Sequence, residues 1–189
     1  MKYPRQSKAG FTIVELLIVI SAIAILATIV VVAYSGVQQR ASDTKTATGV
    51  KHFQEALESY NAMNGSYPPT SGSVCLGTGY SGGKCWAASV NESTTFMDAL
   101  KPYGDSLPKL EQGVYLKGGL FSPASNGNKL DGVNRDFIAY IVGKSGKCPL
   151  GPVVTYISGQ LFSSTAPSSE QTAAPNAFGD VQCWIVLEK

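Results

Sequence analysis

Residues 10–15 of this chain read Gly-Phe-Thr-Ile-Val-Glu, and they lead directly into an apolar segment that runs from Leu16 to Tyr34. Within that segment only Ser21 and Thr28 carry a small polar group. An α-helix rises about 1.5 Å per residue, so the segment would be roughly 28 Å long, close to the ~30 Å hydrocarbon core of a bilayer. The sequence therefore predicts a helix that spans a membrane.

Glu15 is an unusual residue at the edge of such a segment, because no Lys, Arg or His occurs in the twenty residues that follow it. An ionised carboxylate at the centre of a membrane helix costs about 2.5–3.5 kcal/mol on insertion scales, and less near the interface. We therefore expect its partner to come from elsewhere. Cleavage between Gly10 and Phe11 would create an α-amino group one helical turn away, and in a bundle of parallel helices this amine could neutralise Glu15 of a neighbouring subunit and fix the axial stagger.

The short basic leader that ends in Gly10, followed by Phe11, Thr12 and Glu15 in an apolar helix, resembles the prepilin signature of type IV pilins and the related pseudopilins. The resemblance covers residues 5 to about 69. It implies cleavage after Gly10 by a prepilin peptidase, methylation of the Phe11 amine, and polymerisation on an assembly platform in the cytoplasmic membrane. The partners it implies are further copies of the chain and related minor pilins. It also implies a structural protein that has no enzymatic activity and no cofactor.

Two other interpretations of the N-terminus are open. A secretory signal peptide would use the Ala-Ile-Ala at residues 22–24 as its cleavage site, but its apolar region is typically 7–15 residues long, and here the apolar segment continues well past Ala24. A plain single-pass anchor would not explain why Glu15 lies beside Gly10 and Phe11. We therefore favour the pilin interpretation.

Basic residues at the N-terminus predict the orientation of the chain. Lys2, Arg5 and Lys8 precede the apolar segment and should keep the N-terminus in the cytoplasm, so that residues from 36 onward lie outside it. Removal of these three residues with the leader takes the net charge from +2 to −1. The charge balance therefore does not indicate a general affinity for nucleic acid or for acidic substrates.

The chain divides into a leader at residues 1–10, a transmembrane and polymerisation helix at 11–35, and an extracytoplasmic head domain at 36–189. The helix should continue to about residue 63, because Phe53, Ala56, Leu57 and Tyr60 have the spacing of one buried helix face. The Asn-Gly-Ser-Tyr-Pro-Pro stretch that follows should end it, as a similar stretch does in pilins. Many type IV pilins carry a proline where this chain has Val32, which leaves open whether the helix melts in a filament.

The rest of the head domain predicts an α+β fold, with the long helix packed on a small antiparallel sheet of about four strands. Residues 64–112 form a connecting segment with a short helix at 93–101, and residues 113–189 form the sheet. Four segments have strand-like composition, namely 114–116 or as far as 121, 137–142, 153–157 and 181–187. Residues 158–180 should form an exposed loop, and their hydroxyl groups leave O-glycosylation open.

The four cysteines lack C-x-x-C spacing, so disulfides are favoured over a zinc site or redox chemistry. Three pairings are possible, and adjacency favours Cys75 with Cys85 and Cys148 with Cys183. The single histidine, His52, has no second histidine and no nearby cysteine in the sequence, which favours a surface or packing role over metal ligation.

An oxygen-rich run between two predicted strands is a weak candidate for a calcium site, comprising Asn126, Asn128, Asp131, Asn134 and Asp136. Calcium takes six to eight oxygen ligands, and some pseudopilins bind it in their C-terminal loops. The run lacks the EF-hand pattern with its terminal glutamate, so turn formation is the better explanation. No nucleophile elbow and no phosphate-binding glycine motif occurs in the sequence.

The expected function is that of a structural subunit of a type IV pilus filament, for adhesion, twitching motility or DNA uptake. One alternative is a pseudopilin of a type II secretion or competence system. Another is a minor pilin whose head is adhesive or binds DNA, but Lys144 and Lys147 near Tyr140 are too few basic residues to support DNA binding.

Overall fold

The computed structural model describes residues 10–104, 107–110, 118–127, 129–130, 132–143, 148–150, 154–157, 160–163 and 181–187. The chain forms two compact units, Met1–Gln39 and Arg40–Lys189. The helix α1 (Ile13–Asn64) contributes residues to both units. It is 52 residues long and ends one residue after the end predicted from sequence.

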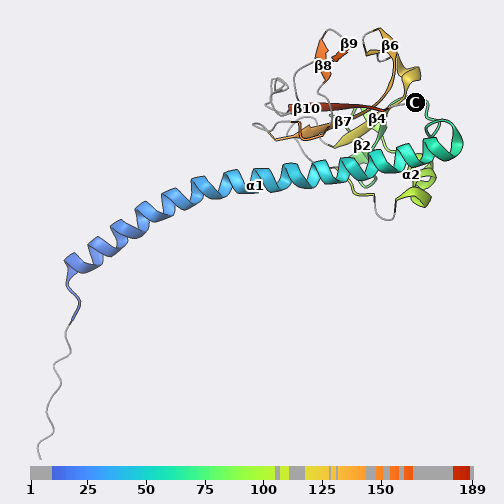
Figure 1. The fold of residues 1–189 in the computed structure, drawn as a ribbon. Coiled ribbons are helices and arrows are strands. Elements are labelled where there is room, and N and C mark those ends of the chain that lie inside the picture. The colour runs from blue at the N-terminus through green and yellow to red at the C-terminus, as the bar shows by residue number, and fades with distance from the viewer. Residues whose placement is uncertain are drawn as a thin grey trace, which may run out of the picture. The chain divides into compact units, whose positions relative to one another are not determined.

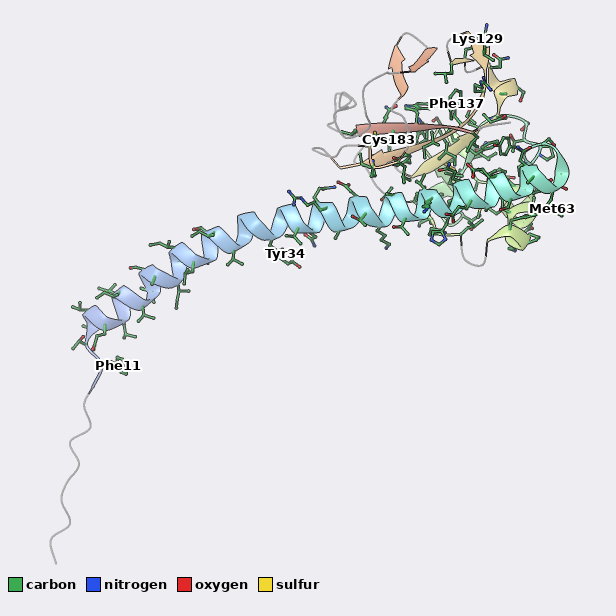
Figure 2. The ribbon with its side chains drawn as sticks, in the orientation of Figure 1. Phe11, Tyr34, Met63, Lys129, Phe137 and Cys183 are labelled. Atoms are coloured by element: carbon green, nitrogen blue, oxygen red, sulfur yellow. A yellow bond between two sulfur atoms is a disulfide. The ribbon has the colours of Figure 1, made fainter. Side chains whose placement is uncertain are left out.

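The first unit consists of the apolar part of α1, whose side chains stand out from the helix on all sides (Figure 2). Ile13–Val30 is long and apolar enough to cross a membrane, and none of it is buried inside the protein. Its two hydroxyl groups bond to the helix itself, Ser21 Oγ to Leu17 O and Thr28 Oγ1 to Ile25 O, both at 2.7 Å. Internal satisfaction of polar groups is what a lipid environment requires.

The second unit is the head domain, and within it the C-terminal part of α1 lies along one face of a β-sheet (Figure 1). The predicted stripe makes this contact, because Phe53, Ala56 and Leu57 are fully buried in the core and Tyr60 packs at its margin. Val50 extends the buried stripe toward the N-terminus of the helix. The α+β class predicted from sequence is therefore confirmed.

Sheet A has six strands in the order β10-β7-β4-β1-β3-β2. Figure 1 labels β10, β7, β4 and β2 of this sheet. The strands are β1 (Val74–Cys75), β2 (Lys84–Cys85), β3 (Val90–Asn91), β4 (Gly119–Ser122), β7 (Asp136–Val142) and β10 (Val181–Leu187). Neighbouring strands are antiparallel except for β1 and β3, which are parallel. Every residue of β7 is buried, since β7 lies between β4 and β10 and has both faces covered.

Sheet B has four strands in the order β6-β5-β9-β8 and lies on the side of sheet A away from α1 (Figure 1). Its strands are β5 (Lys129–Leu130), β6 (Val133–Asn134), β8 (Val154–Ile157) and β9 (Gln160–Ser163). β5 and β9 pair in parallel, and the other neighbours are antiparallel.

The short helices lie between these strands. They are η1 (Ser81–Gly83), α2 (Thr94–Leu100), η2 (Lys101–Tyr103) and η3 (Ala124–Asn126). Ser93 caps α2 by accepting a hydrogen bond from Phe96 N at 3.1 Å, as its position before the helix predicted. Leu100 and Phe96 are the buried residues of α2.

The strand predictions are confirmed for β7, β8 and β10, within one residue at each end. Two expectations are wrong. The first is the single antiparallel sheet of about four strands, since the head contains two sheets with some parallel pairs. The sequence did not indicate the additional strands, because strands of two residues are too short to show a period-2 pattern. The second is the exposed loop at 158–180, which contains the strand β9. The two apolar residues of β9 are flanked by Gln160 and Ser163. The rest of the predicted loop and residues 114–116 lie outside the described residues.

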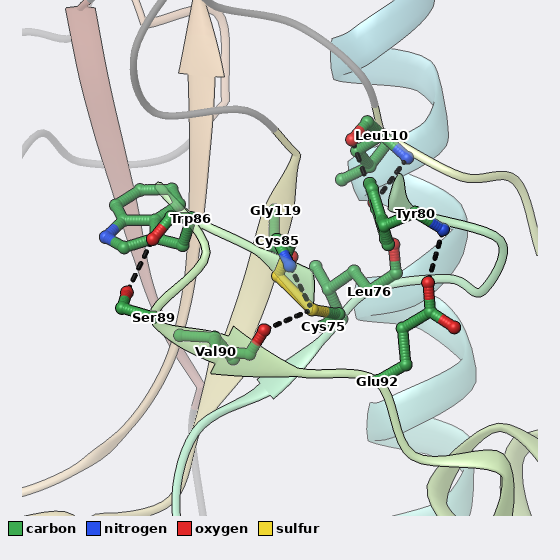
Figure 3. Close-up of a disulfide and its surroundings, with 10 residues drawn as sticks. All are labelled: Cys75, Leu76, Tyr80, Cys85, Trp86, Ser89, Val90, Glu92, Leu110 and Gly119. Atoms are coloured by element: carbon green, nitrogen blue, oxygen red, sulfur yellow. Dashed lines mark hydrogen bonds between the residues drawn. A yellow bond between two sulfur atoms is a disulfide. The ribbon is translucent and has the colours of Figure 1, made fainter. Parts of the chain in front are cut away.

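The structure contains two disulfides, Cys75–Cys85 and Cys148–Cys183, which are the pairs that adjacency favours. The first joins β1 to β2 and is buried in a small apolar cluster (Figure 3). Beside it the buried hydroxyl of Tyr80 donates to Leu76 O at 2.7 Å and accepts from Leu110 N at 3.0 Å. The second ties the edge strand β10 to the segment after β7.

Gly49 allows a close approach inside the head domain. A Cβ atom at this position would lie 2.8 Å from Leu110 Cδ2 and 2.9 Å from Pro108 Cγ. The glycine therefore weakens the helix locally but lets the segment that carries Pro108 and Leu110 pack against it.

Removal of the second disulfide should lower the melting temperature of the head more than removal of the first. The Cys148–Cys183 bond spans 35 residues and the Cys75–Cys85 bond spans 10, so the chain-entropy model gives stabilisation of about 3.8 and 2.7 kcal/mol. Thermal unfolding of the full chain in detergent, followed by circular dichroism, compares the double variants Cys148→Ser/Cys183→Ser and Cys75→Ser/Cys85→Ser. An equal or larger loss in the second variant would contradict this ranking.

Gly49→Ala should also lower the melting temperature of the head. Overpacking costs ~1–3 kcal/mol, which exceeds the gain of about 1 kcal/mol in helix propensity when both Pro108 and Leu110 must move. Gly36→Ala is the matched control, because nothing lies within 4 Å of the added methyl group. The same thermal scan tests both variants, and stabilisation of the head by Gly49→Ala would show that the close approach is unimportant.

Candidate functional site

The candidate site is the start of α1, where the chain enters the apolar helix. Gly10 and Phe11 precede the helix in exposed positions, and the Phe11 side chain is 83% exposed. Apart from the two residues adjacent to Gly10, no described atom lies within 4 Å of a Cβ built at this position. The described part of the chain therefore leaves the peptide bond between these residues uncovered.

Thr12 and Glu15 form a reciprocal hydrogen-bonded pair at this helix start. Glu15 Oε2 accepts from Thr12 N and from Thr12 Oγ1, both at 2.8 Å, and Thr12 Oγ1 accepts from Glu15 N at 3.2 Å. This is a capping box, in which two backbone N–H groups that have no partner within the helix are satisfied by side chains. The carboxylate also carries its negative charge at the positive end of the helix dipole.

The hydrogen bonds between Thr12 and Glu15 correct the sequence-based expectation about the partner of Glu15. We expected its partner to come from elsewhere, whereas the structure provides partners within the chain, three residues away. The role of Thr12 was missed, although the spacing Thr-x-x-Glu before an apolar run is the known signal of a capping box. The cap lowers the cost of placing Glu15 at a membrane interface, because its hydrogen bonds replace part of the lost hydration.

The cap uses only one of the two carboxylate oxygens. Both Thr12 donors bind Oε2, and no residue that the structure describes donates to Oε1. Glu15 also has no ion pair among the described residues, where Lys51–Glu55 and Lys101–Asp98 are formed. The carboxylate can therefore accept a further donor while the cap stays intact.

The apolar side chains that follow the cap have no cover within the chain. From Phe11 to Val30 the large hydrophobic residues are between 52% and 83% exposed, and the exposure is spread around the helix. A helix of this kind is stable in lipid or in a bundle of similar helices, and it would associate in water.

The weak calcium candidates are not brought together within the described part of the chain. Asp136 is buried at the start of β7 and accepts a hydrogen bond from Ala124 N at 2.8 Å. Asn134 is exposed on β6, while Asn128, Asp131 and the side chain of Asn126 lie outside the described residues. Among the residues described, no group of three or more His, Cys, Asp and Glu side chains is arranged to hold a metal ion.

Two other residues singled out in the sequence have ordinary surroundings. His52 is exposed on α1. Tyr140 is fully buried in the core, and burial raises the pKa of its hydroxyl. A buried ring presents no face for stacking on a base, so Tyr140 does not contribute to a nucleic-acid surface.

Comparison with known proteins gives matches to the N-terminal part of the chain. Residues 5–31 match the family model described as the prokaryotic N-terminal methylation motif. The chain is also similar to the type II secretion system core protein G of Klebsiella michiganensis, with 36% identity over 66 residues. That similarity covers 35% of this chain and 46% of the relative, so the chain spans about half the length of the curated relative it matches. No solved structure matches the chain.

The matched residues include Gly10, Phe11, Thr12, Glu15 and most of the apolar helix, which are the residues on which the resemblance rests. Residues 5–31 therefore carry the prokaryotic N-terminal methylation motif, and the N-terminal part of the chain is similar to a type II secretion core protein.

Proposed function

We propose that the chain is a structural subunit of a type IV pilus filament, processed by a prepilin peptidase and polymerised through its N-terminal helix. The observation that carries this proposal is the half-occupied carboxylate of Glu15, with Oε2 held by Thr12 and Oε1 open. Cleavage after Gly10 would create an ammonium group on Phe11. The same group on a neighbouring subunit fits the open oxygen.

The cap gives this pairing a fixed direction. Glu15 is held in one rotamer by its two bonds to Thr12, so the open oxygen has a defined place on the helix surface. Pairing with the neighbour's amine would set the axial stagger between subunits. Because the surroundings would be apolar, such an ion pair is stronger than one in water, and an unpaired carboxylate there would be costly.

The apolar helix supplies both the membrane-inserted precursor and the packing of the filament. Before assembly, Ile13–Val30 would hold the subunit in the cytoplasmic membrane, with the N-terminus inside and the head outside. After assembly, the same exposed side chains would be covered by the helices of other copies. Minor pilins with a similar helix could enter the same bundle.

A second candidate function is a pseudopilin of a type II secretion or competence system. It is favoured by the similarity to the type II secretion system core protein G, which is named as a component of such a system. A minor pilin with an adhesive head is a third candidate. Electron microscopy of sheared surface filaments, with mass spectrometry of their subunits, separates the three by the length and abundance of the fibre that contains the chain.

Processing should produce a mature chain that begins at Phe11 and carries a methylated amine. N-terminal sequencing or mass spectrometry of the surface protein measures this directly. Gly10→Val should block cleavage without disturbing the fold, because Gly10 has open space around it. A mature N-terminus after Ala24, or an uncleaved chain in the surface fraction, would contradict the proposal.

Glu15→Val and Glu15→Gln should both insert into the membrane and fail to form filaments of normal yield. The two variants separate the cap from the charge, because glutamine can still accept from Thr12 N but cannot neutralise an ammonium group. Membrane fractionation reports insertion, and the amount of sheared filament reports assembly. Normal filaments from Glu15→Gln would mean that the cap, and not the ion pair, is what assembly requires.

A further inference from the structure

One face of α1 in the head domain is largely exposed. A groove of about 580 Å³ lies between this face of the helix and Pro108. The α1 residues that line the groove recur every three or four positions, as residues on one helix face do, and they are Ala41, Thr44, Lys45, Thr48, Gly49 and His52. All of them except Gly49 are exposed, whereas Val50, Phe53 and Leu57 of the same helix are buried in the core.

The ionisable side chains that line this groove are Lys45 and His52, and no Asp or Glu lines it. Neither of the two forms an ion pair with a residue that the structure describes. The hydroxyl groups of Thr44 and Thr48 donate to α1 itself, to Arg40 O at 2.8 Å and to Thr44 O at 2.9 Å. The side-chain donors left for a partner are therefore the Lys45 ammonium group and a ring N–H of His52, and both suit a carboxylate.

The charges on α1 are separated along the helix within the head domain. In the basic segment, residues 40–52, the exposed Lys, Arg and His side chains are Arg40, Lys45, Lys51 and His52. In the acidic segment, residues 53–64, the exposed charged side chains are Glu55 and Glu58. Asp43 lies in the basic segment but is half-buried, and its Oδ1 accepts a hydrogen bond from Gly143 N at 2.8 Å. The exposed surface of the helix is therefore basic in one half and acidic in the other.

The contacts that these glutamates make within the helix do little to hold them. Lys51 Nζ lies 3.7 Å from Glu55 Oε1, and the two side chains are 63% and 59% exposed, so the ion pair adds little to stability. Lysine before glutamate is also the less favourable order for an i,i+4 pair. Glu58 Oε1 accepts from Gln54 Nε2 at 2.8 Å, which leaves its charge exposed. Both carboxylates can therefore exchange their present contacts for donors on another molecule.

We propose that the groove receives the acidic segment of α1 from a second copy of the chain. Glu55 and Glu58 of one copy then lie against Lys45 and His52 of the next copy. The inference rests on the proposed function, because polymerisation would bring parallel copies side by side. Two parallel copies without displacement would place like charges opposite each other, which is unfavourable.

A displacement along the helix axis turns the charge pattern into a match. Glu55 follows Thr48 by seven residues and Lys45 by ten, so a shift of about 10–15 Å brings the acidic segment of one copy level with the groove of its neighbour. The two contacting surfaces differ, so each copy still offers its other surface to a further copy. Head-to-tail contacts of this kind extend into open helical filaments when they do not close into a ring.

Charge reversal tests the pairing in filaments made from the full chain. Lys45→Glu and Glu55→Lys should each lower the yield of sheared filament at least about fivefold, because like charges would meet in the groove. The double variant Lys45→Glu/Glu55→Lys should restore most of the yield, because it exchanges the two charges. Lys84→Glu is the matched control, since Lys84 is exposed on β2 and away from α1, and it should leave the yield unchanged.

The outcomes separate this inference from the proposed function. Normal filaments from Lys45→Glu, or a double variant as defective as the single variants, would overturn the pairing and leave the proposed function in place. No filament from the unmodified chain would overturn both. Membrane fractionation and the mature N-terminus of each variant show that a loss of filament arises after insertion and processing.

Photo-crosslinking locates the contact directly. A benzophenone-bearing amino acid in place of Thr48 lies in the groove and should give a crosslinked band of two chains in intact filaments. Mass spectrometry of that band should place the crosslink in the acidic segment of the second copy, and Lys45→Glu should reduce the band at least about fivefold. A crosslink to another segment of the second copy, or to a different protein, would overturn the proposal.

Discussion

The hydrogen bonds between Thr12 and Glu15 are the interaction on which the proposed assembly depends. They satisfy a carboxylate at the edge of an apolar segment that contains no basic residue. Without these hydrogen bonds the ionised Glu15 would enter the membrane with little to replace its hydration. The carboxylate proposed to be needed for assembly would then raise the free-energy cost of membrane insertion. With them the carboxylate keeps one oxygen for a partner from another subunit.

The head domain shows how much of the structure follows from local pattern. The buried stripe from Phe53 to Tyr60, the cap at Ser93 and the long strands β7 and β10 were predicted because each has a strong period or a clear boundary signal. The strands of two residues and the second sheet were not, because their pairing is decided by contacts between segments far apart in the sequence. Gly49 is similar, since only the fold shows that Pro108 and Leu110 occupy the space of a side chain.

The functional features divide in the same way. Glu15 stands out in the sequence because a charge at the edge of an apolar helix is chemically unusual, and it draws attention to Gly10 and Phe11 just before it. Thr12 carries a readable signal that was overlooked, whereas the unpartnered hydroxyl of Thr70 has no signal in the sequence, because its surroundings are set by segments far apart in the chain. A sequence pattern reports periodic burial well, but it does not report which polar groups lack partners.

The most direct test of the proposed assembly is a helical reconstruction, by electron cryomicroscopy, of filaments that contain this chain. We expect the Phe11 nitrogen of one subunit to lie within about 4 Å of the Glu15 carboxylate of a neighbour, the distance of an ion pair. The Thr12 side of the carboxylate should remain capped. Filaments in which Glu15 faces solvent, or in which the Phe11 amine is paired with another group, would contradict the central claim.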